Sequence, residues 1–111
     1  MQHREATIRT ADGGRYMRQL CRHFAHKLPV REDGDTGTVE FSIGVCSMAV
    51  ADDALVLRCA SPDARSAEEL CDVIERHLVR FAWREPLVIE WRPAQAGTDV
   101  PAHADGPVGS G

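Results

Sequence analysis

The chain has 111 residues, which is about the length of one domain and too short for separate catalytic and regulatory units. Its hydrophobic fraction of 43% and charged fraction of 27% are ordinary for a folded domain, so the composition argues against a disordered protein and against a membrane protein. A net charge of -4 lacks the positive surface that neutralises phosphates, so we expect no nucleic-acid partner.

The first predicted elements are a strand and a helix. Residues 4–10 alternate apolar and polar side chains with period two, which indicates a strand. Asp12 can cap a helix over 13–28, and Pro29 ends it because a proline disfavours helical backbone at the preceding residue. The helix has an apolar stripe that predicts its sheet-facing side: Tyr16, Met17, Leu20, Phe24 and Leu28.

The middle of the chain predicts a loop followed by three strands. Residues 31–37 combine glycines with acidic residues and indicate a turn-rich acidic loop. Three runs with strand-like alternation follow, at 38–42, 45–50 and 54–59. Gly44 marks the first reversal between them, so we expect an antiparallel meander.

A second helix and a last strand complete the predicted domain. The helix is expected to begin at Ser61-Pro62, or one turn later at Ser66, which opens a capping-box pattern. Pro86 stops it, and the alternating run 87–91 predicts a strand. The apolar stripe of this helix consists of Ala67, Leu70, Cys71, Ile74, Leu78 and Phe81.

The order β-α-β-β-β-α-β predicts an α+β fold. We expect a two-layer sandwich over residues 1–92, with a five-stranded, mainly antiparallel sheet and both helices on one face. From Pro93 the composition collapses to small and polar residues, so 93–111 is predicted to be a disordered C-terminal tail.

The cysteines and the N-terminus bear on location. No apolar stretch near the N-terminus is long enough for a signal peptide or a membrane span, so we expect a cytoplasmic protein with no membrane partner. The four cysteines are widely spaced without a Cys-x-x-Cys pair, and in a reducing compartment they predict buried free thiols. They are Cys21, Cys46, Cys59 and Cys71.

Three histidines in the predicted helices form a candidate site. His23 and His26 lie three residues apart on one helix and could chelate one metal ion, with His77 as a third ligand and Cys46 as a fourth. The plainer alternative is that His23 and His77 are edge-of-core imidazoles bonded to a backbone carbonyl or an acid. Two parallel helices would point both rings to the same side, so only one could enter the groove between them.

Several blocks of the sequence carry a resemblance to a known family. They are Tyr16-Met17-x-x-Leu20-Cys21-x-His23-Phe24-x-His26-Lys27, Gly44-x-Cys46-x-Met48, His77-Leu78-x-Arg80-Phe81-Ala82-x-Arg84-Glu85 and Trp91. They resemble the bacterial family catalogued as domain of unknown function 2218, over residues 5–92. The resemblance implies a small cytoplasmic protein, sometimes found beside or joined to siderophore-interacting flavin reductases, and therefore a context of iron handling. It implies no catalytic residues.

Two hypotheses on function follow. The chain has no Gly-x-Gly-x-x-Gly, phosphate loop, nucleophile elbow or His-Glu-x-x-His motif, which counts against a nucleotide-dependent enzyme or a common hydrolase. The preferred hypothesis is a non-catalytic accessory or binding module for a protein or a small ligand, linked to iron or siderophore metabolism. The alternative is a metal-binding protein or enzyme that holds iron, zinc or copper with the three histidines, with or without Cys46. Sheet edges and the helix-free sheet face also offer apolar surface for a protein partner or a homodimer.

Overall fold

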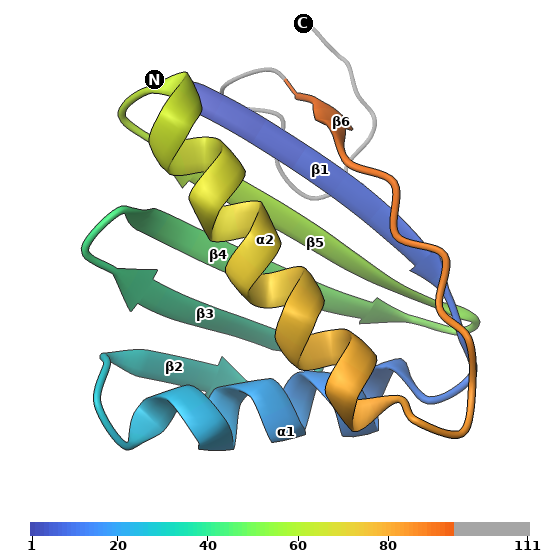
Figure 1. Ribbon diagram of the computed structural model, residues 1–111. Helices are drawn as coiled ribbons and strands as arrows, with labels where there is room; N and C mark the ends of the chain where they lie inside the picture. Colours follow the sequence, from blue (N-terminus) through green and yellow to red (C-terminus); the bar gives the residue numbers. More distant parts are fainter. Residues whose placement is uncertain (95–111) are drawn as a thin grey trace, which may run out of the picture.

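The computed structural model describes residues 1–94, in which the elements follow the order β-α-β-β-β-β-α-β. They are β1 (Gln2–Arg9), α1 (Gly13–Ala25), β2 (Val30–Asp33), β3 (Thr36–Phe41), β4 (Gly44–Ala51), β5 (Ala54–Ser61), α2 (Ala64–Phe81) and β6 (Arg92–Pro93). Figure 1 shows both helices on one face of a single sheet. The predicted α+β two-layer sandwich is therefore confirmed.

The sheet has six strands in the order β2-β3-β4-β5-β1-β6, and every neighbouring pair is antiparallel. The predicted meander is the central run β3-β4-β5. The first strand, β1, lies beside β5, where Ala6 pairs with Leu57 and Ile8 with Leu55. The N-terminal strand is thus an interior strand of the sheet, and both of its neighbours come from much later in the chain.

The core lies between the helices and the sheet. The stripes predicted from helical spacing are the buried faces of both helices, except that Leu28 and Phe81 are only half-buried. The strands contribute alternate residues to the same cluster, which include Ile8, Val39, Leu55 and Leu57. Period in the sequence therefore identified the inward faces of the helices and of the central strands.

The prediction of five strands was one strand short. The first part of the predicted acidic loop 31–37 belongs to a strand. Val30–Asp33 forms β2, and only Gly34 and Asp35 make the turn to β3, with Gly34 at a φ of 61°. β2 is an edge strand whose last three side chains are exposed. An edge strand with so little burial lacks the alternation of hydrophobic residues that marks a half-buried strand, so the sequence read as a loop.

The first helix is shorter than predicted. α1 ends at Ala25 and not at residue 28; the backbone N–H of Lys27 bonds to the carbonyl of Phe24, three residues back, in a turn tighter than the α-helix. Asp12 occupies the N-cap position but makes no side-chain cap hydrogen bond. The carboxylate of Asp12 instead pairs with Arg15 at 3.2 Å.

The second helix begins between the two predicted starts. Asp63 is the N-cap, and its carboxylate oxygen Oδ1 accepts a hydrogen bond from the backbone N–H of Ser66 at 2.8 Å. This bond lowers the pKa of Asp63. Ser66 is therefore capped and is not itself the cap, so the capping-box prediction was wrong. An aspartate at this position satisfies one of the free N–H groups of the first turn.

The last predicted strand is also displaced. Residues 87–91 are irregular, and the ladder forms only at Arg92 and Pro93, which pair with β1. Leu87, Ile89 and Trp91 do pack on the core, so the predicted alternation of burial is present without hydrogen-bonded pairing. Of the predicted tail 93–111, residues 95–111 lie outside the described residues. Neither α1 nor α2 is long and apolar enough to cross a membrane.

Candidate functional site: the junction of the two helices

The last turns of α2 lie against α1. In Figure 1, α2 runs obliquely over the sheet and its C-terminal end reaches α1. This arrangement brings the rings of His23 and His77 together, with their centroids 4.7 Å apart and 49° between the ring planes. The difficulty expected for parallel helices does not arise, because helices that cross present different sides to each other.

Aromatic rings surround the histidine pair. Phe24 has its ring centroid 5.0 Å from that of His23 and 4.9 Å from that of His77. Phe41 packs behind Phe24 at 5.0 Å, and Phe81 lies 6.0 Å from His23. His77 is half-buried among these rings, whereas His23 is exposed. The pair therefore has an apolar side toward the core and an open side toward solvent.

The hydrogen bonds of the pair leave one nitrogen of His77 available. Nδ1 of His77 lies 2.7 Å from the carbonyl oxygen of Val73, and because a carbonyl can only accept, Nδ1 carries the proton. The Nε2 atom then keeps its lone pair. Burial, followed by the neighbouring His77, His26 and Arg80, lowers the pKa of His23 and favours its neutral ring. The edge-of-core interpretation is thus correct for the backbone contact of His77, and within residues 1–94 the Nε2 atom makes no hydrogen bond.

The other two members of the predicted metal set lie apart from this pair. His26 is exposed at the C-cap of α1. Cys46 is 0% exposed in β4, opposite Cys59 of β5. Within residues 1–94, no group of three or more His, Cys, Asp and Glu side chains is placed to hold a metal ion. The structure therefore brings His23 and His77 together and does not assemble all four residues.

The four cysteines are buried and free, as the sequence predicted. Hydrogen bonding with Cys46, together with burial, raises the pKa of Cys59. Hydrogen bonding with Cys59, together with burial, raises the pKa of Cys71. A thiol whose pKa is raised keeps its proton and is a poor nucleophile and a poor metal ligand. These thiols belong to the core.

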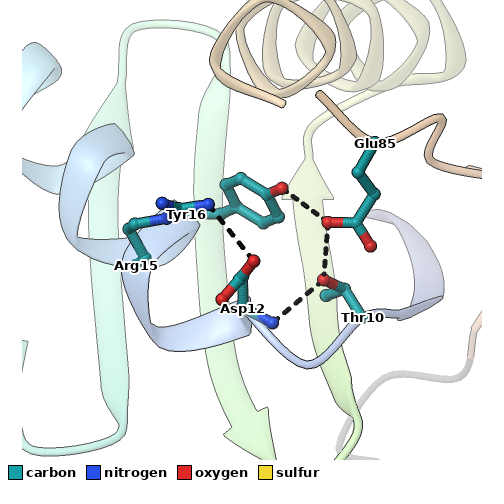
Figure 2. Close-up of polar contacts among 5 residues, drawn as sticks. All are labelled: Thr10, Asp12, Arg15, Tyr16 and Glu85. Carbon is teal, nitrogen blue, oxygen red and sulfur yellow. Dashed lines mark hydrogen bonds and ion pairs between the residues drawn. The ribbon is translucent and has the colours of Figure 1, made fainter. Parts of the chain in front are cut away.

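A second polar cluster lies at the other end of α1 (Figure 2). The hydroxyl of Tyr16 donates a hydrogen bond to Oε1 of Glu85 at 2.6 Å, and the hydroxyl of Thr10 donates to the same oxygen at 3.2 Å. The backbone N–H of Asp12 donates in turn to the Thr10 hydroxyl at 3.0 Å. This network joins the start of α1 to the segment that follows α2.

Sequence reasoning placed Tyr16 in an apolar stripe and did not select Glu85. The available signal was the tyrosine itself, because a hydroxyl in a core stripe needs a hydrogen-bond partner. Burial and the hydrogen bond to Glu85 raise the pKa of Tyr16, so its hydroxyl stays protonated and keeps donating. Which acid would supply the partner depends on the path of the chain after α2, and no local pattern reveals that path.

The fold and this junction define a small two-layer α+β domain with a histidine pair between its helices. The family described as "Uncharacterized protein conserved in bacteria (DUF2218)" matches residues 5–92, and the chain belongs to this family. A similar solved structure is the NMR structure of PA4090 from Pseudomonas aeruginosa, which is 31% identical, covers 86% of this chain and 100% of that chain, and has a TM-score of 0.73. No curated protein matches the chain.

Proposed function

We propose that this protein is a small binding module and that its ligand is a transition-metal ion held by His23 and His77. The observation that supports this proposal is the 4.7 Å separation of two imidazole rings that come from different helices. An ion bound by both rings would link α1 to α2 and would stabilise their crossing. Any ligand that binds only the folded state stabilises that state in proportion to its affinity and concentration.

The chemistry of the pair suits borderline metals. Neutral imidazole nitrogens bind zinc, copper, nickel and iron. The hydrogen bond from His77 to the Val73 carbonyl fixes the tautomer and the orientation of that ring, which is how outer contacts usually prepare a histidine ligand. His26 follows His23 by about one turn of helix and is exposed, so rotation of its side chain would add a third ligand. Water would complete the coordination on the open side.

The proposal includes a cellular setting. Four reduced thiols suit the cytoplasm, where disulfides are rare. Iron belongs among the ions to be tested, in line with the siderophore context that the family resemblance implies. We favour binding over catalysis because the side chains that pack on the two rings are phenylalanines, which contribute neither an acid nor a nucleophile.

The test is a titration of the untagged, full-length chain with zinc, copper(II) and iron(II). Binding is measured by calorimetry and from the NMR signals of the histidine rings. We expect about one ion per chain, with shifts at His23 and His77. His23→Ala weakens binding by about tenfold or more, which corresponds to 1.4 kcal/mol. The matched control is His3→Ala, a half-buried histidine in β1 that leaves affinity unchanged.

Two further variants sharpen the test. His77→Ala is expected to weaken binding as His23→Ala does, and His26→Ala reports whether a third imidazole joins the site. The proposal fails if the double variant His23→Ala/His77→Ala binds each ion as tightly as the original chain. It also fails if no ion binds more tightly than to the histidines of the unfolded chain.

A further inference from the structure

A hollow lies between the first half of α1 and the turn that follows α2; it is not lined by either histidine, although Phe81 borders both the hollow and the histidine pair. It has a volume of about 280 Å³ and is lined by Arg15, Tyr16, Gln19, Phe81, Trp83 and Arg84. This volume is close to the lower end of the range for small-molecule sites, which suits a ligand of one ring and not a nucleotide.

Trp83 is the unusual residue of this hollow. Trp83 is 75% exposed, although tryptophan is highly buried on average in folded proteins. The segment around it is held in place by backbone bonds from Ala82 to Leu78 and from Glu85 to Ala82. The guanidinium carbon of Arg84 lies 4.5 Å from the Trp83 ring centroid. The indole is therefore presented to solvent from an ordered turn, with a cation beside it.

The charges around the hollow favour an anion. Arg84 has no carboxylate partner within residues 1–94, and the only carboxylate partner of Arg15 there is the exposed Asp12. An exposed pair of this kind contributes little and exchanges readily for another anion. The nearest acid along the chain, Glu85, already accepts two hydrogen bonds from Tyr16 and Thr10, as Figure 2 shows. Two guanidinium groups thus line the hollow; Asp12 pairs with Arg15 and Glu85 lies beside Tyr16, whereas Arg84 is left without a carboxylate partner within residues 1–94.

The ring surfaces favour a flat ligand. Phe81 and Trp83 line the hollow opposite α1, and aromatic side chains bind flat rings by stacking or by edge-to-face contact. The guanidinium fork matches a carboxylate in a two-point hydrogen bond. The amide of Gln19 adds a donor and an acceptor for a ring substituent.

The geometry points to a second ligand site in this hollow, for a small aromatic carboxylate. Its carboxylate binds between Arg15 and Arg84, and its ring lies against Trp83 and Phe81. The site uses none of the metal-binding histidines, so it goes beyond the proposed function and can succeed or fail independently of it.

The test is titration of the isotope-labelled full-length chain with benzoate. Binding is monitored by NMR through the indole signal of Trp83 and the amide signals of Gln19. The expected result is a saturable shift confined to the hollow. Two comparison ligands separate the contributions: cyclohexanecarboxylate keeps the charge without the flat ring, and benzyl alcohol keeps the ring without the charge. Both are expected to bind more weakly than benzoate.

Matched variants complete the test. Arg84→Gln weakens benzoate binding by about tenfold or more, because a hydrogen bond to a charged group is lost. Trp83→Ala removes the preference for benzoate over cyclohexanecarboxylate. The control is Arg76→Gln, an exposed arginine of α2 that pairs with Asp72 at 3.1 Å and lies outside the hollow.

Three outcomes would contradict the proposal of a ligand site in this hollow. The first is the absence of a saturable shift at Trp83, and the second is equal benzoate affinity in Arg84→Gln and the original chain. The third is inorganic phosphate binding as tightly as benzoate, which would mean a general attraction of anions to exposed arginines. All three residues changed here are exposed, so the variants should retain the fold, and the dispersion of their NMR spectra checks this.

Discussion

The two polar clusters of the helix junction differ in how completely their hydrogen-bonding groups are used. In the Tyr16–Glu85 network, both hydroxyls and the backbone N–H of Asp12 have partners within 3.2 Å. In the histidine pair, the only hydrogen bond within the described part of the chain runs from His77 to Val73. The hydroxyls of the network are therefore all paired, whereas within residues 1–94 the other ring nitrogens of the histidine pair make no hydrogen bond.

Under the proposed function, this difference separates a structural role for the network from a binding role for the histidine pair. Buried polar groups that satisfy one another stabilise the fold and are costly to remove. Polar groups left without partners add little to stability and are available to a ligand. We therefore expect substitutions in the network to reduce stability, and substitutions of the histidines to reduce ligand binding while the phenylalanines around them hold the junction together.

The largest effect is expected from Phe24→Ala. Phe24 is 9% exposed and packs on Phe41 and His77, so its removal leaves a cavity between α1 and the sheet. Urea denaturation should show a loss of about 3 kcal/mol in the free energy of unfolding. Val79→Ala, at an exposed position of α2, is the control. A loss smaller than that of His23→Ala would contradict the assignment of stability to the phenylalanines.

A loss of about 2 kcal/mol is expected for Glu85→Ala, because the buried hydroxyl of Tyr16 would lose its partner. The matched control is Glu90→Ala, an exposed acid in the same connecting segment. Tyr16→Phe should cost less, since it removes the donor together with its need for a partner. Equal stability of Glu85→Ala and Glu90→Ala would show that the network does not hold the connecting segment.

The network should also impose a pH dependence. The raised pKa of Tyr16, above its ordinary value of 10.0, means that the folded protein keeps this proton to higher pH than the unfolded chain does. Its contribution to the free energy of unfolding is complete below about pH 10 and is lost as the pH rises through the folded pKa. Tyr16 is the chain's only tyrosine, so tyrosinate absorbance measures the pKa directly in both states. Identical pKa values folded and unfolded would contradict the burial of this hydroxyl.

The smallest effect on stability is expected from His23→Ala in metal-free solution. The ring is exposed and makes no hydrogen bond within residues 1–94, so the free energy of unfolding should change by no more than about 0.5 kcal/mol. The same variant should reduce the stabilisation that added zinc gives the original chain, because the ion binds more weakly. A large loss of stability without metal would assign His23 a packing role and remove the contrast between the two clusters.

Local pattern was sufficient for most elements. The helical stripes that include Leu20 and Ile74, and the alternation of the central strands, identified the buried faces because period depends only on neighbouring residues. It failed at β2, where burial is too slight to leave a pattern, and at 87–91, where alternate residues pack on the core without pairing. Both failures lie toward the sheet edges, where hydrogen bonding and burial no longer coincide.

The sequence by itself determined the fold class, the inward faces of the helices, the buried thiols and the histidines worth considering. The tertiary structure decided that His23 meets His77, that His26 and Cys46 stand apart, and that Tyr16 meets Glu85. The physical reason is that a side chain's face follows from the helical or strand period. Which faces meet depends on how α1 and α2 cross over a sheet whose strand order is set by pairing between distant residues.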